Sequence, residues 1–176
     1  PLWFAFSANL RLQKYLITQL PTEVLDAAET LHRLKRPGDR VIARKPHLAF
    51  HAGVEAVPFP FADSLADLAR GARLAGARWL YISWPEVETR PAFWHLLDTS
   101  GVVPGLTGRR LTRPHPSVLY EIGPEFGRRP AWFDNDTLRA WHTVQGHLRV
   151  DGGNPRMLAQ YGALARALGQ REEARR

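Results

Sequence analysis

The sequence predicts an α/β fold: a layered mixed sheet of about five strands with flanking helices, followed by a C-terminal α-helical hairpin. Three observations lead to this prediction. Short β-prone runs alternate with helical patterns of roughly 10–15 residues, which is typical of layered α/β folds. Two further β-prone runs are separated only by Pro114-His115-Pro116, which favours an antiparallel pair. The remainder of the chain has helical periodicity.

Helical patterns open the chain. Residues 7–20 are weakly amphipathic and end before Pro21. A firmer helix follows, because Thr22 can cap it and apolar side chains recur at helical spacing as far as Leu34. Pro37-Gly38 ends it. Later helices are expected over residues 46–52, from Asp63 or Ser64 to Gly76, and over residues 91–98.

Five strands are expected between and after these helices. Trp79–Ser83 is almost continuously apolar, as a buried parallel strand should be. The others mix polar and apolar residues, and the two that flank Pro114-His115-Pro116 form the expected hairpin at one edge of the sheet. The five predicted strands are residues 40–44, 54–59, 79–83, 106–113 and 117–122.

Beyond the sheet, Gly, Pro and Arg are frequent, and helical patterns then continue to the end of the chain. Asp134 or Asp136 can cap the first helix, residues 151–155 break it, and a second helix runs to Gly169. The sequence thus divides into a juxtamembrane or N-terminal segment, an α/β domain, a linker and a helical tail: residues 1–20, 21–123, 124–133 and 134–176.

Composition narrows the class of protein. The chain has 176 residues, of which 44% are hydrophobic and 23% charged, close to globular averages. Its net charge of +7 is compatible with binding to nucleic acid or to an anionic membrane surface. The arginines are scattered, however, so we attribute the charge to the overall composition and expect no nucleic acid partner.

The absence of cysteine excludes disulfides and thiolate chemistry. No apolar run reaches the roughly 18–20 residues that span a bilayer. Because the chain begins at Pro1 and its single methionine is Met157, we expect a piece of a longer polypeptide.

The most informative stretch contains a strand end, two cations and a helix start. Arg44 and Lys45 end the first strand, and Pro46 suits the first position of the next helix. Cations beside the free N–H groups of a helix N-terminus favour an anion site, so Arg44, Lys45 and His47 are the candidate ligand-binding residues. The alternative is that the two cations alternate across the strand end and only one faces a cleft.

Other constellations are weaker. His47 and His51 share a helix face but have no third ligand nearby, so we expect no metal. Glu86, Glu88 and Asp98 surround a predicted helix after a strand, where α/β proteins place sites, yet the first two also fit ordinary first-turn residues of that helix. No phosphate loop or nucleophile elbow occurs, so we expect no catalytic residue and no cofactor.

The C-terminal helices carry a repeat-like pattern. Small and apolar residues match the first helix, turn and second-helix start of a tetratricopeptide repeat (TPR), and an ordinary helical hairpin is the equal alternative. The matching positions are Leu158, Tyr161, Gly162, Ala165, Gly169 and Ala174.

Residues 21–122 resemble the soluble C-terminal domain of bacterial polytopic membrane proteins related to GT-C-type glycosyltransferases, the dolichyl-phosphate-mannose–protein mannosyltransferase-like group. The resemblance rests on residues 27–31, residues 37–47, residues 49–53, residues 58–60 and residues 79–83. It implies a transmembrane body upstream in the same polypeptide and an extracytoplasmic, periplasmic position for this domain. Relatives transfer sugar from a polyprenyl-phosphate carrier, and their catalytic acids lie in an early loop that this chain lacks.

The resemblance implies a non-catalytic domain that shapes donor or acceptor access, or binds a partner. An anionic lipid phosphate or membrane surface is one expected partner, and a protein bound by residues 134–176 is another. The alternative function is a protein–protein interaction module without any link to glycosyl transfer. A small enzyme acting on an anionic metabolite is a third possibility.

Overall fold

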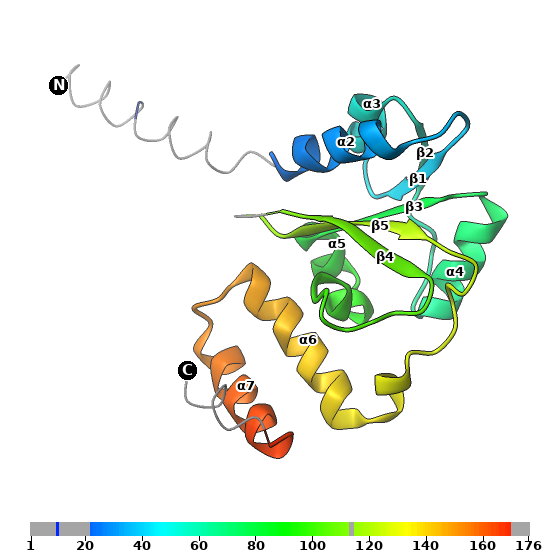
Figure 1. Ribbon diagram of the computed structural model, residues 1–176. Helices are drawn as coiled ribbons and strands as arrows, with labels where there is room; N and C mark the ends of the chain where they lie inside the picture. Colours follow the sequence, from blue (N-terminus) through cyan, green and yellow to red (C-terminus); the bar gives the residue numbers. More distant parts are fainter. Residues whose placement is uncertain (1–9, 11–21, 113–114, 170–176) are drawn as a thin grey trace.

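The computed structural model describes residues 10, 22–112 and 115–169. It confirms the predicted fold class, because a five-stranded mixed sheet carries helices on both faces and two packed helices follow it (Figure 1). The weakly amphipathic stretch 7–20, apart from Leu10, and the repeat position Ala174 lie outside the described residues. Within the described part of the chain, no helix is both long and apolar enough to cross a membrane.

The sheet has the strand order β2-β1-β3-β5-β4. β1 is parallel to both β2 and β3, while β5 is antiparallel to β3 and to the edge strand β4. The bounds agree with the sequence prediction to within two residues: β1 is Arg40–Ala43, β2 Glu55–Pro58, β3 Trp79–Ser83, β4 Leu106–Leu111 and β5 Ser117–Ile122.

One face of the sheet is covered by α2 (Glu23–Leu34) and α3 (His47–Ala52). Alanines on both helices are buried against Val41 and Trp79, and their small side chains let the helices pack closely on the strands. α3 has a favourable cation at its C-terminal end, because Lys35 Nζ donates to the carbonyl oxygen of Ala52 at 2.7 Å. Gly53 then ends α3 with a φ of 66°, a value that favours glycine.

The other face is covered by α4 (Leu65–Leu74), α5 (Trp84–Thr89) and the 3₁₀ helix η1 (Pro91–Leu97). Two differences from the sequence prediction occur here. α5 was not predicted, and the helix expected over residues 91–98 is a 3₁₀ helix. Residues 93–97 of η1 are all buried, so the sequence has no regular spacing of polar and apolar residues here. Without that spacing, a 3₁₀ helix cannot be distinguished from an α-helix in the sequence.

The tail consists of η2 (Ala131–Asp134), α6 (Asp136–Val150) and α7 (Pro155–Ala167). The cap of α6 is Asn135 and neither of the predicted aspartates, because Asn135 Oδ1 accepts from the N–H groups of Thr137 and Leu138. α6 and α7 are joined by a stack of Trp141 on Tyr161, with ring centroids 4.7 Å apart. The expected linker places Phe126 in the core, 3% exposed.

Candidate functional site

The topology of the sheet creates a crevice at the carboxyl end of β1. From β1 the chain crosses through α3 to β2 on one side, and it then passes through α4 to β3 on the other side of β1. α3 and α4 therefore lie on opposite faces, and the loops that leave β1 and β3 diverge. Open α/β sheets bind ligands at such switch points. A pocket of about 100 Å³ lies at this position, and we call it the switch-point crevice.

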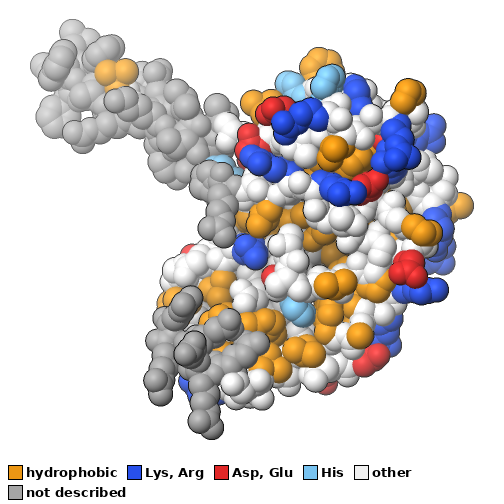
Figure 2. All heavy atoms as spheres, viewed as in Figure 1, with side chains coloured by type: hydrophobic (Ala, Val, Ile, Leu, Met, Phe, Trp, Pro, Cys, Tyr) orange, Lys and Arg blue, Asp and Glu red, His pale blue; other side chains and the backbone are white. Residues whose placement is uncertain are grey.

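Three exposed basic residues line the crevice: Arg44, Lys45 and His47. They are the residues that the sequence predicted as the ligand site, and the loop after β1 brings all three to one pocket. Lys45 and His47 have no hydrogen bond or ion pair with another described residue. Figure 2 shows Lys, Arg and His side chains gathered over the part of the molecule that α2, α3 and the adjacent strands form. The exposed side of the crevice is therefore positively charged.

The N-terminus of α3 contributes less to anion binding than the sequence suggested. Pro46 is the N-cap of α3 and not its first residue, and α3 has only six residues. Such a short helix has a weak dipole and few free N–H groups. Any affinity for an anion must therefore come from the side chains of Arg44, Lys45 and His47.

Glu86 enters the crevice from α5 and fixes Arg44. Arg44 Nε lies 3.3 Å from Glu86 Oε1, and the Ser83 N–H donates to Glu86 Oε2 at 2.9 Å. Ser83 and Glu86 also form a capping box at the start of α5, in which the Ser83 hydroxyl accepts from the Glu86 N–H, and the same hydroxyl donates to Glu86 Oε2. Only Nε of Arg44 is engaged by these described groups, so its two terminal nitrogens keep their donors for another acceptor.

Two further buried polar groups, Glu23 from α2 and Tyr81 from β3, line the crevice. Glu23 is 4% exposed and Tyr81 is 3% exposed. Within the described part of the chain, Glu23 Oε2 and the Tyr81 hydroxyl have no hydrogen bond of normal geometry. Burial raises the pKa of the Glu23 carboxyl. Burial likewise raises the pKa of the Tyr81 phenol, against smaller opposing effects of the neighbouring Ser117 and Ser83 hydroxyls.

Sequence reasoning missed this buried half of the site. Glu23 resembles an ordinary first-turn residue of α2, and Tyr81 resembles one more apolar residue of a buried strand. Glu86 was considered, but as a first-turn residue of the helix over 91–98, whereas it belongs to α5. The topology of the sheet, which no local pattern reveals, brings these residues to the end of β1.

The remaining candidates lie apart from the crevice. His51 is exposed and does not line it, and Glu88 is exposed on α5. Asp98 is buried elsewhere, 2.7 Å from His142. No group of three or more potential ligands among the described residues could hold a metal ion.

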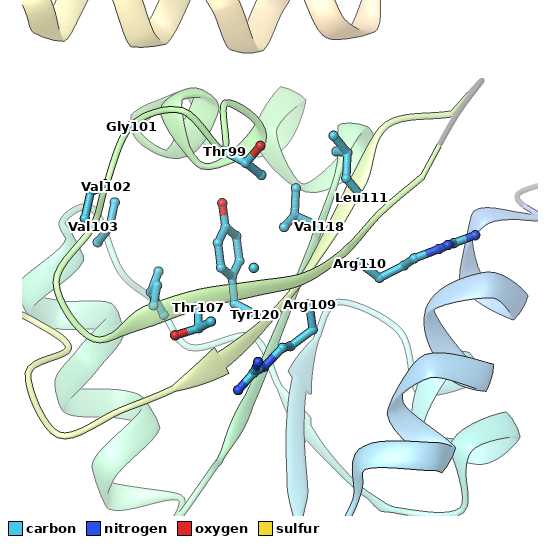
Figure 3. A pocket seen from close by; sticks show the side chains of 12 residues that line it. Thr99, Gly101, Val102, Val103, Thr107, Arg109, Arg110, Leu111, Val118 and Tyr120 are labelled. Atoms are coloured by element: carbon cyan, nitrogen blue, oxygen red, sulfur yellow. The ribbon is translucent and has the colours of Figure 1, made fainter.

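A second hollow, of about 360 Å³, lies beside the edge strand β4 (Figure 3). Tyr120 points into it from β5, whereas Arg109 and Arg110 point away from it. Arg109 pairs with Glu121, and Arg110 lies 3.2 Å from Asp26. Since its arginines are engaged elsewhere, this hollow offers less to a polar ligand than the switch-point crevice.

A third hollow, of about 560 Å³, is lined by residues of α4, η1, α6 and α7. His95 lines it and is 4% exposed, and its Nε2 has no partner among the described residues. Burial lowers the pKa of His95 to about 4, and the nearby His142 acts in the same direction. The imidazole is therefore neutral near pH 7 and serves as a packing residue beneath α6.

The fold and the crevice define the class of this chain: an open-sheet α/β protein with a polar pocket at its switch point and a helical tail. No family model, curated protein or solved structure matches the chain. The family resemblance of residues 21–122 therefore remains a prediction.

Proposed function

We propose that this chain is a non-catalytic, extracytoplasmic domain of a polytopic membrane glycosyltransferase-like protein that uses a polyprenyl-phosphate sugar donor. In this proposal the switch-point crevice binds an anionic head group and so influences donor or acceptor access. The membrane body and the glycosyl donor rest on the sequence resemblance alone. The convergence of Arg44, Lys45 and His47 on one pocket carries the binding role.

The crevice suits a phosphate better than a larger anion. Arg44 offers two terminal nitrogens in a planar fork, Lys45 offers a mobile ammonium group, and His47 adds a ring nitrogen. A pocket of about 100 Å³ is well below the roughly 300–1,000 Å³ of sites that enclose a drug-sized ligand. The crevice can therefore hold a head group, while the rest of a lipid or sugar would remain outside.

The binding role can be tested by titrating the chain with inorganic phosphate and with a short prenyl phosphate at low salt, followed by NMR or calorimetry. Charge-assisted hydrogen bonds contribute about 1.5–3 kcal/mol each, so the double variant R44A/K45A should bind at least tenfold more weakly. Added salt should weaken binding to the wild type.

The matched control is R156A/R166A, which removes the same charge from exposed positions of α7. Its affinity for phosphate should equal that of the wild type. Equal losses in both double variants would mean that only net charge attracts the anion, and unchanged binding in R44A/K45A would refute the crevice as the site.

A second candidate function is protein–protein interaction through the helical tail. α7 packs against α6, and Leu158 on α7 is exposed at 43% while Met157 and Leu164 are half-buried. A further helix stacked on α7 would cover these side chains, as in helical repeat arrays. The wild type should then self-associate at high concentration in sedimentation velocity experiments, and L158K should not. A monomeric wild type throughout would count against an open stacking face.

A further inference from the structure

Two buried polar atoms of the switch-point crevice stand out in the part of the chain that the structure describes. Glu23 Oε2 and the Tyr81 hydroxyl lack a hydrogen-bond partner among the described residues, although both residues are more than nine-tenths buried. Buried polar groups in native proteins are nearly always paired, and exceptions need an explanation. Both residues line the same pocket, so a ligand in that pocket can supply the missing partner.

The Ser83 and Ser117 hydroxyls lie near the Tyr81 phenol and lower its pKa slightly, but neither has the geometry of a full hydrogen bond to it. Ser83 donates its hydroxyl to Glu86, and the Ser117 hydroxyl is shared with Thr112 at 2.8 Å. The Glu86 carboxylate is also engaged, by Arg44 and by the Ser83 N–H. Because Ser83 donates to Glu86 and Ser117 is shared with Thr112, Glu23 Oε2 and the Tyr81 phenol oxygen remain as acceptors for a group that donates several hydrogen bonds.

The charge pattern identifies that group. The buried side of the crevice holds two carboxyl groups, Glu23 and Glu86, whereas its exposed side holds the cations of Arg44 and Lys45. A primary ammonium has three donors and a positive charge, which match a carboxylate and a phenol oxygen. A negatively charged group on the outer side of this ammonium would contact the cations of Arg44 and Lys45. The ligand is therefore positive at its inner end and negative at its outer end.

Size limits the inner end further. About 100 Å³ holds a few water-sized groups, each of which occupies about 30 Å³ in the liquid. An aminoethyl group fits this space. A trimethylammonium group has no N–H donor, so it cannot donate hydrogen bonds to Glu23 and Tyr81.

We infer that the crevice binds the phosphate ester of a short amino alcohol, with the primary ammonium on Glu23 and Tyr81 and the phosphate on Arg44, Lys45 and His47. This inference rests on the proposed anion-binding function and adds the inner half of the ligand. Such a group occurs in free amino-alcohol phosphates and in aminophospholipid head groups, and both present the same chemistry to the crevice.

The test compares four soluble probes on the full chain: phosphoethanolamine, phosphocholine, ethanolamine and inorganic phosphate. Phosphoethanolamine should bind at least tenfold more tightly than inorganic phosphate and phosphocholine. The variants E23Q and Y81F should each reduce the ratio of phosphoethanolamine affinity to inorganic phosphate affinity to less than threefold. Both substitutions keep side-chain size, and thermal unfolding checks that each variant folds.

The outcomes separate the inference from the proposed function. Equal affinity for phosphoethanolamine and phosphate, or an unchanged preference in both variants, overturns the inference and leaves the anion site standing. Absence of phosphate binding in the wild type overturns both. If the preference is present, vesicles of phosphatidylethanolamine mixed with phosphatidylcholine identify its source. Cosedimentation that Y81F weakens indicates a lipid head group, and binding of the soluble probe alone indicates a free ester.

Discussion

His142 Nδ1 lies 2.7 Å from Asp98 Oδ2, and this buried contact joins α6 to the end of η1. Ser100 donates its hydroxyl to the same carboxylate, and Arg149 lies 3.7 Å from it. Burial alone would raise the pKa of Asp98, but the hydrogen bonds from His142 and Ser100 outweigh it and lower the pKa. The Asp98 carboxylate therefore binds side chains of α6 as well as Ser100, and so holds the helical tail against the sheet domain.

Removing this contact should loosen the tail. In H142A the buried Asp98 loses its closest partner, and the free energy of unfolding should fall by about 1–3 kcal/mol. Urea unfolding measures the loss, and hydrogen exchange should show the largest increase in α6. The exposed His51 provides the control, since H51A should unfold like the wild type. If the two variants are equally stable, the Asp98–His142 contact does not hold the tail.

The contribution of Asp98 has a defined sign with pH. Because its folded pKa is lowered, the stability it contributes is present above the ordinary carboxyl value of 3.8 and is lost as the pH falls through the folded pKa. The contribution of Asp98 is therefore constant near neutral pH, and it varies with pH only in strongly acidic solution.

His95 should determine stability at milder acidity. Its pKa is about 4 in the folded chain, against 6.5 for an ordinary histidine, so the unfolded chain binds the extra proton first. The contribution of the neutral imidazole is complete above pH 6.5 and declines as the pH falls toward 4. Between pH 7 and pH 4.5 the loss should be about 2–3 kcal/mol.

Guanidinium unfolding of wild type and H95F at pH 7 and pH 4.5 checks this expectation. H95F keeps an aromatic ring but has no titratable group, so its stability should change less over this range. The control H47N alters an exposed histidine and should keep the full pH dependence. A pH dependence in H95F as steep as that of the wild type would assign the effect to other groups.

The crossing of α6 over η1 depends on Gly146. A Cβ atom at this position would lie 2.1 Å from the Trp94 carbonyl oxygen, which is a backbone atom that cannot move aside. G146A should therefore push α6 away and lower the free energy of unfolding by about 2–3 kcal/mol. The stack of Trp94 on His147, with centroids 3.7 Å apart, should be lost at the same time.

Tryptophan fluorescence and urea unfolding report this change. The matched control is G153A, because a Cβ there would meet only Asp151 Oδ1, at 3.8 Å. A G146A variant as stable as G153A would mean that α6 does not approach η1 so closely.

The sequence predicted the strands well, because Trp79–Ser83 is a buried apolar run and the prolines at 114 and 116 mark the hairpin turn. The grouping of Arg44, Lys45 and His47 at one pocket could also be predicted, since they are neighbours in the chain. Glu23 and Tyr81 were not predicted, because they meet those residues only through the position of β1 between β2 and β3. The junction of Asp98 with His142 was missed for the same reason: it depends on how a distant helix packs.

The ion pair between Arg44 and Glu86 links the stability of α5 to the charge of the crevice. E86Q removes the negative charge beside Arg44 and weakens the capping box, so α5 should lose about 1 kcal/mol. At the same time Arg44 is no longer neutralised by Glu86, and the affinity for inorganic phosphate should rise severalfold. E88Q is the matched control, because Glu88 is an exposed carboxylate on the same short helix. Calorimetric titration at low salt distinguishes two roles for Glu86: higher affinity in E86Q means that Glu86 opposes anion binding, whereas lower affinity would mean that it holds Arg44 in the binding position.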